Sequence, residues 1–376
     1  MSLSPEPPNQ ALPSGYTFSK FPYQLIEVLG QGGFGITYKA TELKTNLKVV
    51  IKEHFPLNLV TRQDNRVIPL QVAGPADFKQ SLGHFLKEAQ TLTNFNHANI
   101  VKIKNYFRDL GTAYFVMPFL AGESLETILS RSPGQSLEEI KKWFTPILDG
   151  LQAVHARGIV HRDIKPSNVF IQTDLNPILI DFGSAGDILG GDMQNQFVTH
   201  GFAPPEQYLQ TAIAQGPWTD IYALGAVLLY CLTGRDLPNS VARLIATTEG
   251  TFDPLEPTLQ AVETKLKPIW ARALRGCLCP EVKGRIKGVA ELRRYLGIEI
   301  AEQPSKIKPK SLKTEAINKQ NVINPKDLSL KGRLKNIWTT IISYYNDIRM
   351  FLFKDKSSII FFIVFIIVIS LIFYIC

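Results

Sequence analysis

The sequence has little cysteine, and this limits the chemistry available to it. Four cysteines occur in 376 residues, at Cys231, Cys277, Cys279 and Cys376. One residue separates Cys277 from Cys279, and no second Cys/His pair stands at the spacing of a zinc site. This pattern disfavours a disulfide scaffold or a zinc module. We predict that the cysteines are small core residues in a reducing compartment.

The N-terminus lacks the features of a signal peptide. Residues 1–15 contain four prolines, no basic residue and no apolar run. We therefore predict that residues 1–22 form a disordered segment.

The larger part of the chain also lacks an excess of positive charge. The first 300 residues carry 29 Lys and Arg against 28 Asp and Glu, whereas residues 301–376 carry 12 against 5. This balance gives no support for nucleic-acid binding. The basic C-terminal part instead points to a membrane surface.

The last twenty residues, 357–376, lack charge altogether and consist mainly of Ile, Phe, Val and Leu. As a helix they would span roughly 30 Å, the thickness of a bilayer core. A buried helix of a soluble domain is the alternative, but a helix with every face apolar favours the membrane. Lys354 and Lys356 precede the span, so we expect a single-pass membrane anchor with the preceding chain in the cytoplasm.

Two further segments precede this span. Residues 298–327 have the composition of a basic linker. Residues 328–353 carry apolar residues at alternating spacings of four and three, which predicts an amphipathic helix. Its wide apolar face favours membrane lipid as the partner, and a homodimer seam is the alternative.

Before residue 298, strand patterns come first and helix patterns later. Alternating apolar residues predict strands at 23–29, 36–40 and 48–52. Helical spacing follows at 78–95, 137–157, 219–233 and 265–279. The order predicts an α+β fold with a small β-rich lobe and a larger helical lobe.

A glycine-rich turn joins the first two predicted strands, with the sequence Gly30-Gln31-Gly32-Gly33-Phe34-Gly35. Glycines let a backbone approach phosphate oxygens without Cβ clashes. Such a motif also opens helices in dinucleotide-binding folds or forms a plain hairpin, but here a strand follows it. Lys52 ends the third predicted strand. It is either a solvated strand end or the partner of an anion, for which Glu88 is the candidate.

The densest cluster of chemically useful side chains is residues 161–168, His-Arg-Asp-Ile-Lys-Pro-Ser-Asn. It gathers an acid, a base, a cation and an amide between apolar stretches. Asp181-Phe182-Gly183 follows after another apolar run. Asp181 and Asn168 offer the oxygen ligands that suit Mg²⁺.

These motifs, in this order and with Ala203-Pro204-Pro205-Glu206, resemble the eukaryotic-type (Hanks-type) protein kinases, and bacterial Ser/Thr kinases in particular. The resemblance covers about residues 23–297. It implies a bilobal protein-kinase fold, with ATP bound between the lobes, Mg²⁺ as the ion and Mn²⁺ as its substitute.

The resemblance also implies a role for each matching residue. Gly30 to Gly35 would cover the ATP phosphates, and Lys52 would bind them and pair with Glu88. Asp163 would accept the substrate proton, Lys165 would neutralise the transferred phosphoryl group, and Asn168 and Asp181 would hold the metal.

Further matches point to Ser and Thr as the target residues. Lys165 and Thr199 are typical of Ser/Thr kinases, and Thr199 would contact Asp163. Met117 would guard the adenine pocket, and Pro118 to Leu120 would form the hinge. Two matches are structural: Glu206 would pair with Arg285, and Asp220 would brace the catalytic loop.

Two features depart from the family pattern. Residues 53–80 form an insert rich in turn-forming residues, whose function the sequence does not indicate. Between Asp181 and Glu206 the hydroxyl side chains are Ser184 and Thr199. We therefore predict that this loop needs no phosphate to become ordered.

The sequence thus predicts a membrane-anchored Ser/Thr protein kinase that acts on proteins in signalling. A pseudokinase scaffold that binds ATP without transfer is the main alternative, and the intact motifs argue against it. A small-molecule phosphotransferase is the second, and Thr199 with residues 203–206 argues against that.

Overall fold

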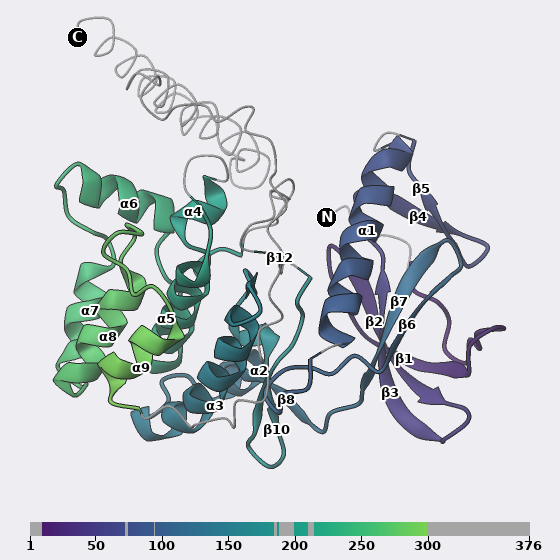
Figure 1. The fold of residues 1–376 in the computed structure, drawn as a ribbon, viewed down its shortest axis with the longest axis horizontal. Coiled ribbons are helices and arrows are strands. Elements are labelled where there is room, and N and C mark those ends of the chain that lie inside the picture. Colours follow the sequence, from purple (N-terminus) through teal and green to yellow (C-terminus); the bar gives the residue numbers. More distant parts are fainter. Residues whose placement is uncertain are drawn as a thin grey trace, which may run out of the picture. The chain divides into compact units, whose positions relative to one another are not determined.

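The computed structural model describes residues 10–71, 74–93, 95–183, 186–187, 199–209 and 214–298. Strands come first and helices later, as predicted (Figure 1). The predicted linker, amphipathic helix and membrane helix lie outside the described residues. Within the described ranges, no helix combines the length and hydropathy that crossing a membrane requires.

The small lobe is a five-stranded antiparallel sheet with α1 packed against it (Figure 1). In spatial order the strands are β1 (Tyr23–Gln31), β2 (Gly35–Glu42), β3 (Leu47–His54), β7 (Thr112–Pro118) and β6 (Asn105–Asp109). Helix α1 spans Gly74–Thr93. Its Phe85 ring stacks on Phe115 of β7 with centroids 3.8 Å apart. Lys52 is paired with Phe115 in the β3–β7 register, so it shares the sheet face that α1 covers.

The predicted insert contains a second, two-stranded sheet between β3 and α1. Strands β4 (Val60–Gln63) and β5 (Arg66–Pro69) are joined by Asp64 and Asn65, with φ angles of 48° and 64°. Two successive positive φ values are those of a type I′ turn, which matches the right-handed twist of a hairpin. The Val67 amide donates to the Leu110 carbonyl at 2.7 Å. The insert is therefore tied to the turn between β6 and β7.

The prediction of a disordered segment over residues 1–22 is wrong for residues 10–22. Leu12 and Phe18 are only 2% and 3% exposed. The Phe18 ring meets Tyr114 edge-on, with centroids 5.0 Å apart. The Gly15 amide donates to the Leu25 carbonyl at 2.9 Å. Leu12 and Phe18, together with the partly buried Tyr16 and Phe21, pack this segment against the small lobe although they show no periodicity.

The large lobe is built mainly from helices. They are α2 (Leu125–Arg131), α3 (Leu137–His155), α4 (Pro205–Tyr208), α5 (Pro217–Thr233), α6 (Ser240–Thr248), α7 (Glu256–Glu263), α8 (Pro268–Leu278) and α9 (Val289–Leu296). The short elements are β8 (Gly122–Ser124), β9 (Ile159–Val160), the 3-10 turn η1 (Pro166–Asn168), β10 (Val169–Gln172), β11 (Pro177–Leu179) and β12 (Gly186–Asp187). Helix α3 begins at a capping box formed by Ser136 and Glu139, which satisfies its first amides.

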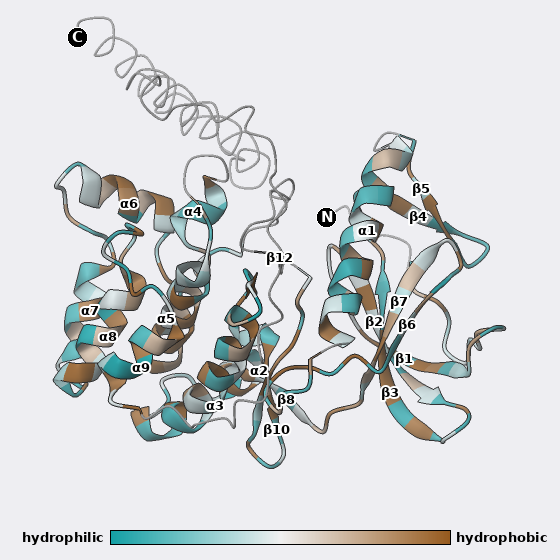
Figure 2. Cartoon of the chain, viewed as in Figure 1, coloured by the Kyte–Doolittle hydropathy of each residue, from teal (hydrophilic) through white to brown (hydrophobic). Residues whose placement is uncertain are grey.

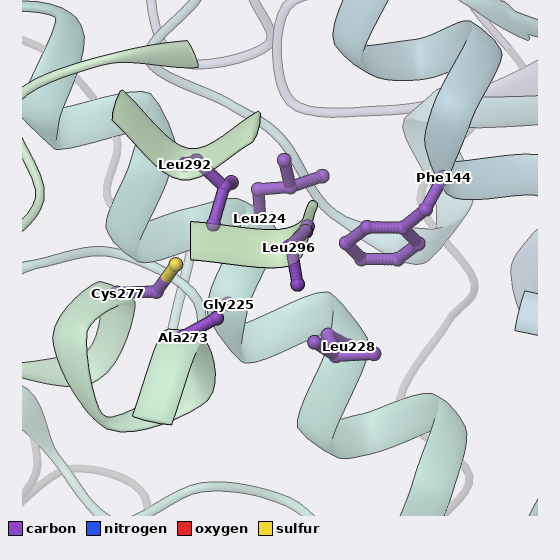
Figure 3. Close-up of a pocket in the computed structure, with 8 residues that line it drawn as sticks. All are labelled: Phe144, Leu224, Gly225, Leu228, Ala273, Cys277, Leu292 and Leu296. Atoms are coloured by element: carbon purple, nitrogen blue, oxygen red, sulfur yellow. The ribbon is translucent and has the colours of Figure 1, made fainter. Parts of the chain in front are cut away.

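Helix α5 forms the centre of the large lobe. Twelve of its 17 residues are buried, and hydrophobic residues occur along it (Figure 2). A Cβ on Gly225 would lie 2.6 Å from the Cys277 Cβ, so the approach of α8 requires glycine there. A cavity of about 10 Å³ lies beside α5. Its lining is apolar, and it is the size of one water at most (Figure 3). Cys231 and Cys277 are 0% and 2% exposed, which confirms the prediction of core positions for these two. Cys279 is only partly buried, and Cys376 lies outside the described residues.

Candidate active site

Asp220 of α5 supports the loop between β9 and η1. The Asp220 carboxylate accepts the backbone amides of His161 and Arg162, each at 2.8 Å, and lies 2.7 Å from His155 Nε2. Burial alone would raise the pKa of Asp220, but the hydrogen bond and charge of His155 outweigh it and lower the pKa. Asp220 therefore braces the loop as an anion, as predicted.

Three predicted site residues contact the carboxylate of a fourth, Asp163. Thr199 Oγ1 donates to Asp163 Oδ1 at 2.8 Å. Asp163 Oδ2 lies 2.9 Å from Lys165 Nζ and accepts Asn168 Nδ2 at 2.8 Å. Lys165 Nζ also donates to Thr199 Oγ1 at 3.2 Å. The predicted contact between Thr199 and Asp163 is thus present, and the carboxylate has one fixed orientation.

Gln207 is a neighbour of this loop that sequence reasoning missed. Its side-chain amide donates to the Arg162 carbonyl at 2.7 Å, and the residue is 2% exposed. Arg162 has a φ of 66°, a conformation that costs free energy in a non-glycine residue. Gln207 and Asp220 thus fix the backbone on both sides of this strained residue, directly before Asp163.

The segment that carries Gln207 is itself anchored by a buried ion pair. Arg285 donates to both oxygens of Glu206, at 2.5 and 3.1 Å, and both side chains are fully buried. Thr219 Oγ1 donates to the same carboxylate at 3.0 Å. The predicted pair between Glu206 and Arg285 is confirmed.

The predicted pair between Lys52 and Glu88 is wrong for the described structure. Lys52 Nζ instead donates to Asp181 Oδ1 at 2.5 Å. Glu88 Oε2 is buried and has no hydrogen-bond partner among the described residues. A Cβ on Gly183 would be 3.7 Å from Glu88 Oε2 and 3.8 Å from Lys52 Nζ, so the groups remain neighbours. The resemblance to the family correctly placed Glu88 near Lys52. It did not predict that Asp181, rather than Glu88, would accept the hydrogen bond of the Lys52 ammonium group.

The two carboxyls beside Lys52 differ in ionisation. Burial raises the pKa of Glu88 to about 8, and the Lys52 charge only partly offsets this. Desolvation also acts to raise the pKa of Asp181, but the charge and hydrogen bond of Lys52 lower it to about 2. Of these two carboxyls, Lys52 therefore favours the anionic form of Asp181, while burial favours the protonated form of Glu88.

The glycine-rich turn joins β1 to β2, and three of its glycines face open space. A Cβ on Gly30, Gly32 or Gly33 would meet no atom within 4 Å. These glycines are not required by packing within the described chain, and their small size suits the approach of a ligand. Gly35 differs, because its Cβ would lie 2.4 Å from the Glu53 carbonyl oxygen. Gln31 ends β1, and the Phe34 side chain is 43% exposed.

One predicted adenine-pocket residue, Met117, continues the sheet face on which Lys52 lies. Met117 is paired with Val50 in the β3–β7 register, two positions from the pair of Lys52 and Phe115. Pro118 ends β7, and Leu120 follows it and packs against the core. The structure thus places Met117 on the same face as Lys52, at the edge where β7 leads into the large lobe.

The two predicted metal ligands offer suitable oxygen atoms. Asn168 uses its side-chain nitrogen to donate to Asp163, which leaves its carbonyl oxygen as an acceptor. Asp181 has a low pKa and is therefore ionised. One amide oxygen and one carboxylate fit Mg²⁺, which binds few protein ligands and retains waters. Within the described ranges, no cluster of three or more His, Cys, Asp or Glu forms a separate metal site.

Comparison with known proteins agrees with this geometry. Residues 23–286 match the model of the family described as protein kinase domain. The chain is 32% identical over 228 residues to serine/threonine-protein kinase B of Synechocystis sp. and 34% identical over 226 residues to kinase D of the same organism. Each match covers 57% of this chain, but only 37% and 41% of the relative. The chain thus spans about two-fifths of the length of these relatives.

A solved structure agrees as well. The chain described as the apo form of PpkA-294 is 30% identical and superposes with a TM-score of 0.65. The match covers 77% of this chain and all of that one.

Proposed function

Because the chain belongs to the protein kinase domain family, we propose that it is a Ser/Thr protein kinase that transfers the γ-phosphate of ATP to hydroxyl groups of protein substrates. The contact of Asp163 with Thr199, Lys165 and Asn168 carries this proposal. A scaffold without activity would not need one carboxylate oriented by three separate donors.

Asp163 acts as the base that receives the proton of the substrate hydroxyl. The donors on both of its oxygens hold the carboxylate in one orientation, which keeps an acceptor position directed at the hydroxyl. Lys165 lies 2.9 Å from Asp163 Oδ2 and stabilises the negative charge that develops near this carboxylate. Thr199 links both groups to the segment that receives the protein substrate.

Lys52 and the glycine-rich turn bind the phosphates of ATP. Lys52 lies 2.5 Å from Asp181, so nucleotide binding requires Lys52 to share its charge between Asp181 and the phosphates. Asn168 and Asp181 would hold the divalent ion, which would neutralise phosphate charge.

We also propose that residues 357–376 anchor the protein in a membrane, with residues 328–353 lying on the lipid surface. The uncharged composition of 357–376 and the basic residues before it support this assignment. Sodium carbonate extraction of cell membranes tests it. The full chain should remain in the membrane pellet, and a chain that ends at residue 302 should be released.

The activity is tested with the full chain purified in detergent, γ-labelled ATP, Mg²⁺ and a general protein substrate. Wild type should yield labelled phosphoserine or phosphothreonine. Asp163→Ala should yield none, and Asp174→Ala, at an exposed turn, should match wild type. Nucleotide binding without transfer by wild type would refute the kinase assignment in favour of the pseudokinase scaffold.

A further inference from the structure

The chain that leaves β3 stays attached to the glycine-rich turn. The β2–β3 register ends with Gly35 opposite His54. Beyond that point the Phe55 amide donates to the Phe34 carbonyl at 3.0 Å, and the Leu57 amide donates to the Gly33 carbonyl at 3.1 Å. Both acceptors belong to the turn that covers the phosphates. Residues 55–57, which follow β3, therefore continue the backbone hydrogen bonding between β3 and this turn.

These residues are fixed on their other side by the rest of the insert. Phe55 is fully buried, and the Arg62 guanidinium lies over its ring, 4.9 Å from the centroid. Arg62 also donates to Glu53 at 2.6 Å, next to Lys52 in β3. The Arg62 amide donates to the Gln10 side chain at 2.8 Å. Residues 55–57 are thus held between the sheet and the β4–β5 hairpin, and the hairpin is in turn bound to the N-terminal segment.

We propose that residues 55–57 clamp the glycine-rich turn in the position that binds nucleotide phosphates. The proposal rests on the function proposed above, since it needs ATP at this turn. A turn built from glycines has few side-chain contacts to fix it, and ordering it on binding would reduce affinity. The two hydrogen bonds from Phe55 and Leu57 supply that order in advance. Leu57 is then a positioning residue that acts through Gly33.

One substitution removes a single bond of the clamp. The Pro56 carbonyl accepts the Leu59 amide at 2.9 Å, so Leu57 is the second residue of a turn, where proline is favoured. Its side chain is 44% exposed. Leu57→Pro therefore keeps the turn but removes the amide that donates to Gly33. Leu57→Ala is the matched control, because it removes the side chain and keeps the amide.

Two measurements on the full chain in detergent test the clamp: binding of a fluorescent ADP analogue with Mg²⁺, and hydrogen exchange over residues 29–36 and 55–58. We expect Leu57→Pro to weaken binding roughly two- to tenfold, the effect of one hydrogen bond, and to speed exchange in both segments. Leu57→Ala should match wild type. Equal affinity and exchange in the two variants, or tighter binding by Leu57→Pro, would overturn the proposal.

Arg62→Lys gives a second route should Leu57→Pro fail to fold. It keeps the buried charge but loses the planar fork of the guanidinium. Faster exchange over residues 55–58 and weaker ADP binding support the clamp. Faster exchange at residues 60–63 with unchanged ADP affinity refutes it. Because ADP binding requires no transfer, a wild-type protein that binds ADP but does not phosphorylate protein refutes the proposed activity alone.

Discussion

The two lobes each bury a glutamate completely, and the contrast between them is informative. Glu206 in the large lobe accepts hydrogen bonds from Arg285 and Thr219. Glu53 in the small lobe accepts Tyr38 and Tyr114 at 2.7 Å each, and Arg62 at 2.6 Å. The first relies on one arginine that is itself fully buried. The second shares its charge among groups from β2, β7 and the insert.

A third glutamate, Glu88 of α1, is partly buried in the same small lobe and has a different environment. Glu88 Oε2 has no partner among the described residues, and burial raises its pKa to about 8. Burial alone therefore does not indicate an ion pair. The number and placement of donors decide whether a buried carboxyl stays charged.

The largest effect should come from Arg285→Met. This variant leaves the Glu206 charge fully buried without its cation, which should lower the free energy of unfolding by about 3–5 kcal/mol. Urea unfolding followed by circular dichroism measures it. A loss below about 1 kcal/mol would show that Thr219 and water suffice to stabilise the anion.

The next effect is the dependence of stability on pH that Glu88 causes. Its pKa is raised in the folded protein, so the folded state retains a proton that the unfolded state loses above about pH 4.5. Its contribution to stability is present below that pH and is lost as pH rises towards 8, by at most about 1.4 kcal/mol per unit.

Glu88→Gln cannot ionise and should remove this dependence. Unfolding at pH 6, 7 and 8 should show a smaller loss of stability with pH in the variant than in wild type. Parallel curves for the two proteins would mean that Glu88 is ionised in the folded state.

Arg62→Met should have a smaller effect than Arg285→Met, about 1.5–3 kcal/mol. Glu53 retains the hydroxyls of Tyr38 and Tyr114, and the Arg62 side chain is 8% exposed rather than fully buried. The same urea titration compares the two arginines directly. Equal losses would remove the distinction between a shared and an unshared buried charge.

The smallest change in stability should come from Gln207→Leu, about 0.5–1.5 kcal/mol for one hydrogen bond. The backbone before Asp163 loses a support, so we expect kcat to fall about tenfold with the KM for ATP unchanged. Gln260→Leu, at an exposed position in α7, is the control. A lower stability with unchanged kcat would make Gln207 purely structural.

Sequence reasoning predicted the parts in which local pattern and motif agree. The strands 23–29, 36–40 and 48–52 and the four helices appear in the structure, because alternation and helical spacing report burial directly. The Asp163 cluster was predicted in its composition and its Thr199 contact, because a short segment carries most of it.

Other contacts join positions that no local pattern relates. Arg62 and Gln10 are 52 residues apart, and Gln207 and Arg162 are 45 apart. Leu12 and Phe18 are buried against core residues of the sheet, which come together only after the sheet has formed. Asp181 rather than Glu88 accepts the Lys52 ammonium group, and this choice depends on side-chain positions that sequence spacing does not determine.

The support of the catalytic loop by Asp220 has a consequence for synthesis. The five-stranded sheet is complete once Pro118 has been made, whereas Asp220 follows His161 by 59 residues. Ribosomes deliver the N-terminal residues first. A nascent chain can therefore fold the nucleotide-binding sheet well before the backbone that carries Asp163 has its support. We expect the sheet that carries Lys52 and the glycine-rich turn to form early on the ribosome, and catalysis to begin only after α5 has emerged.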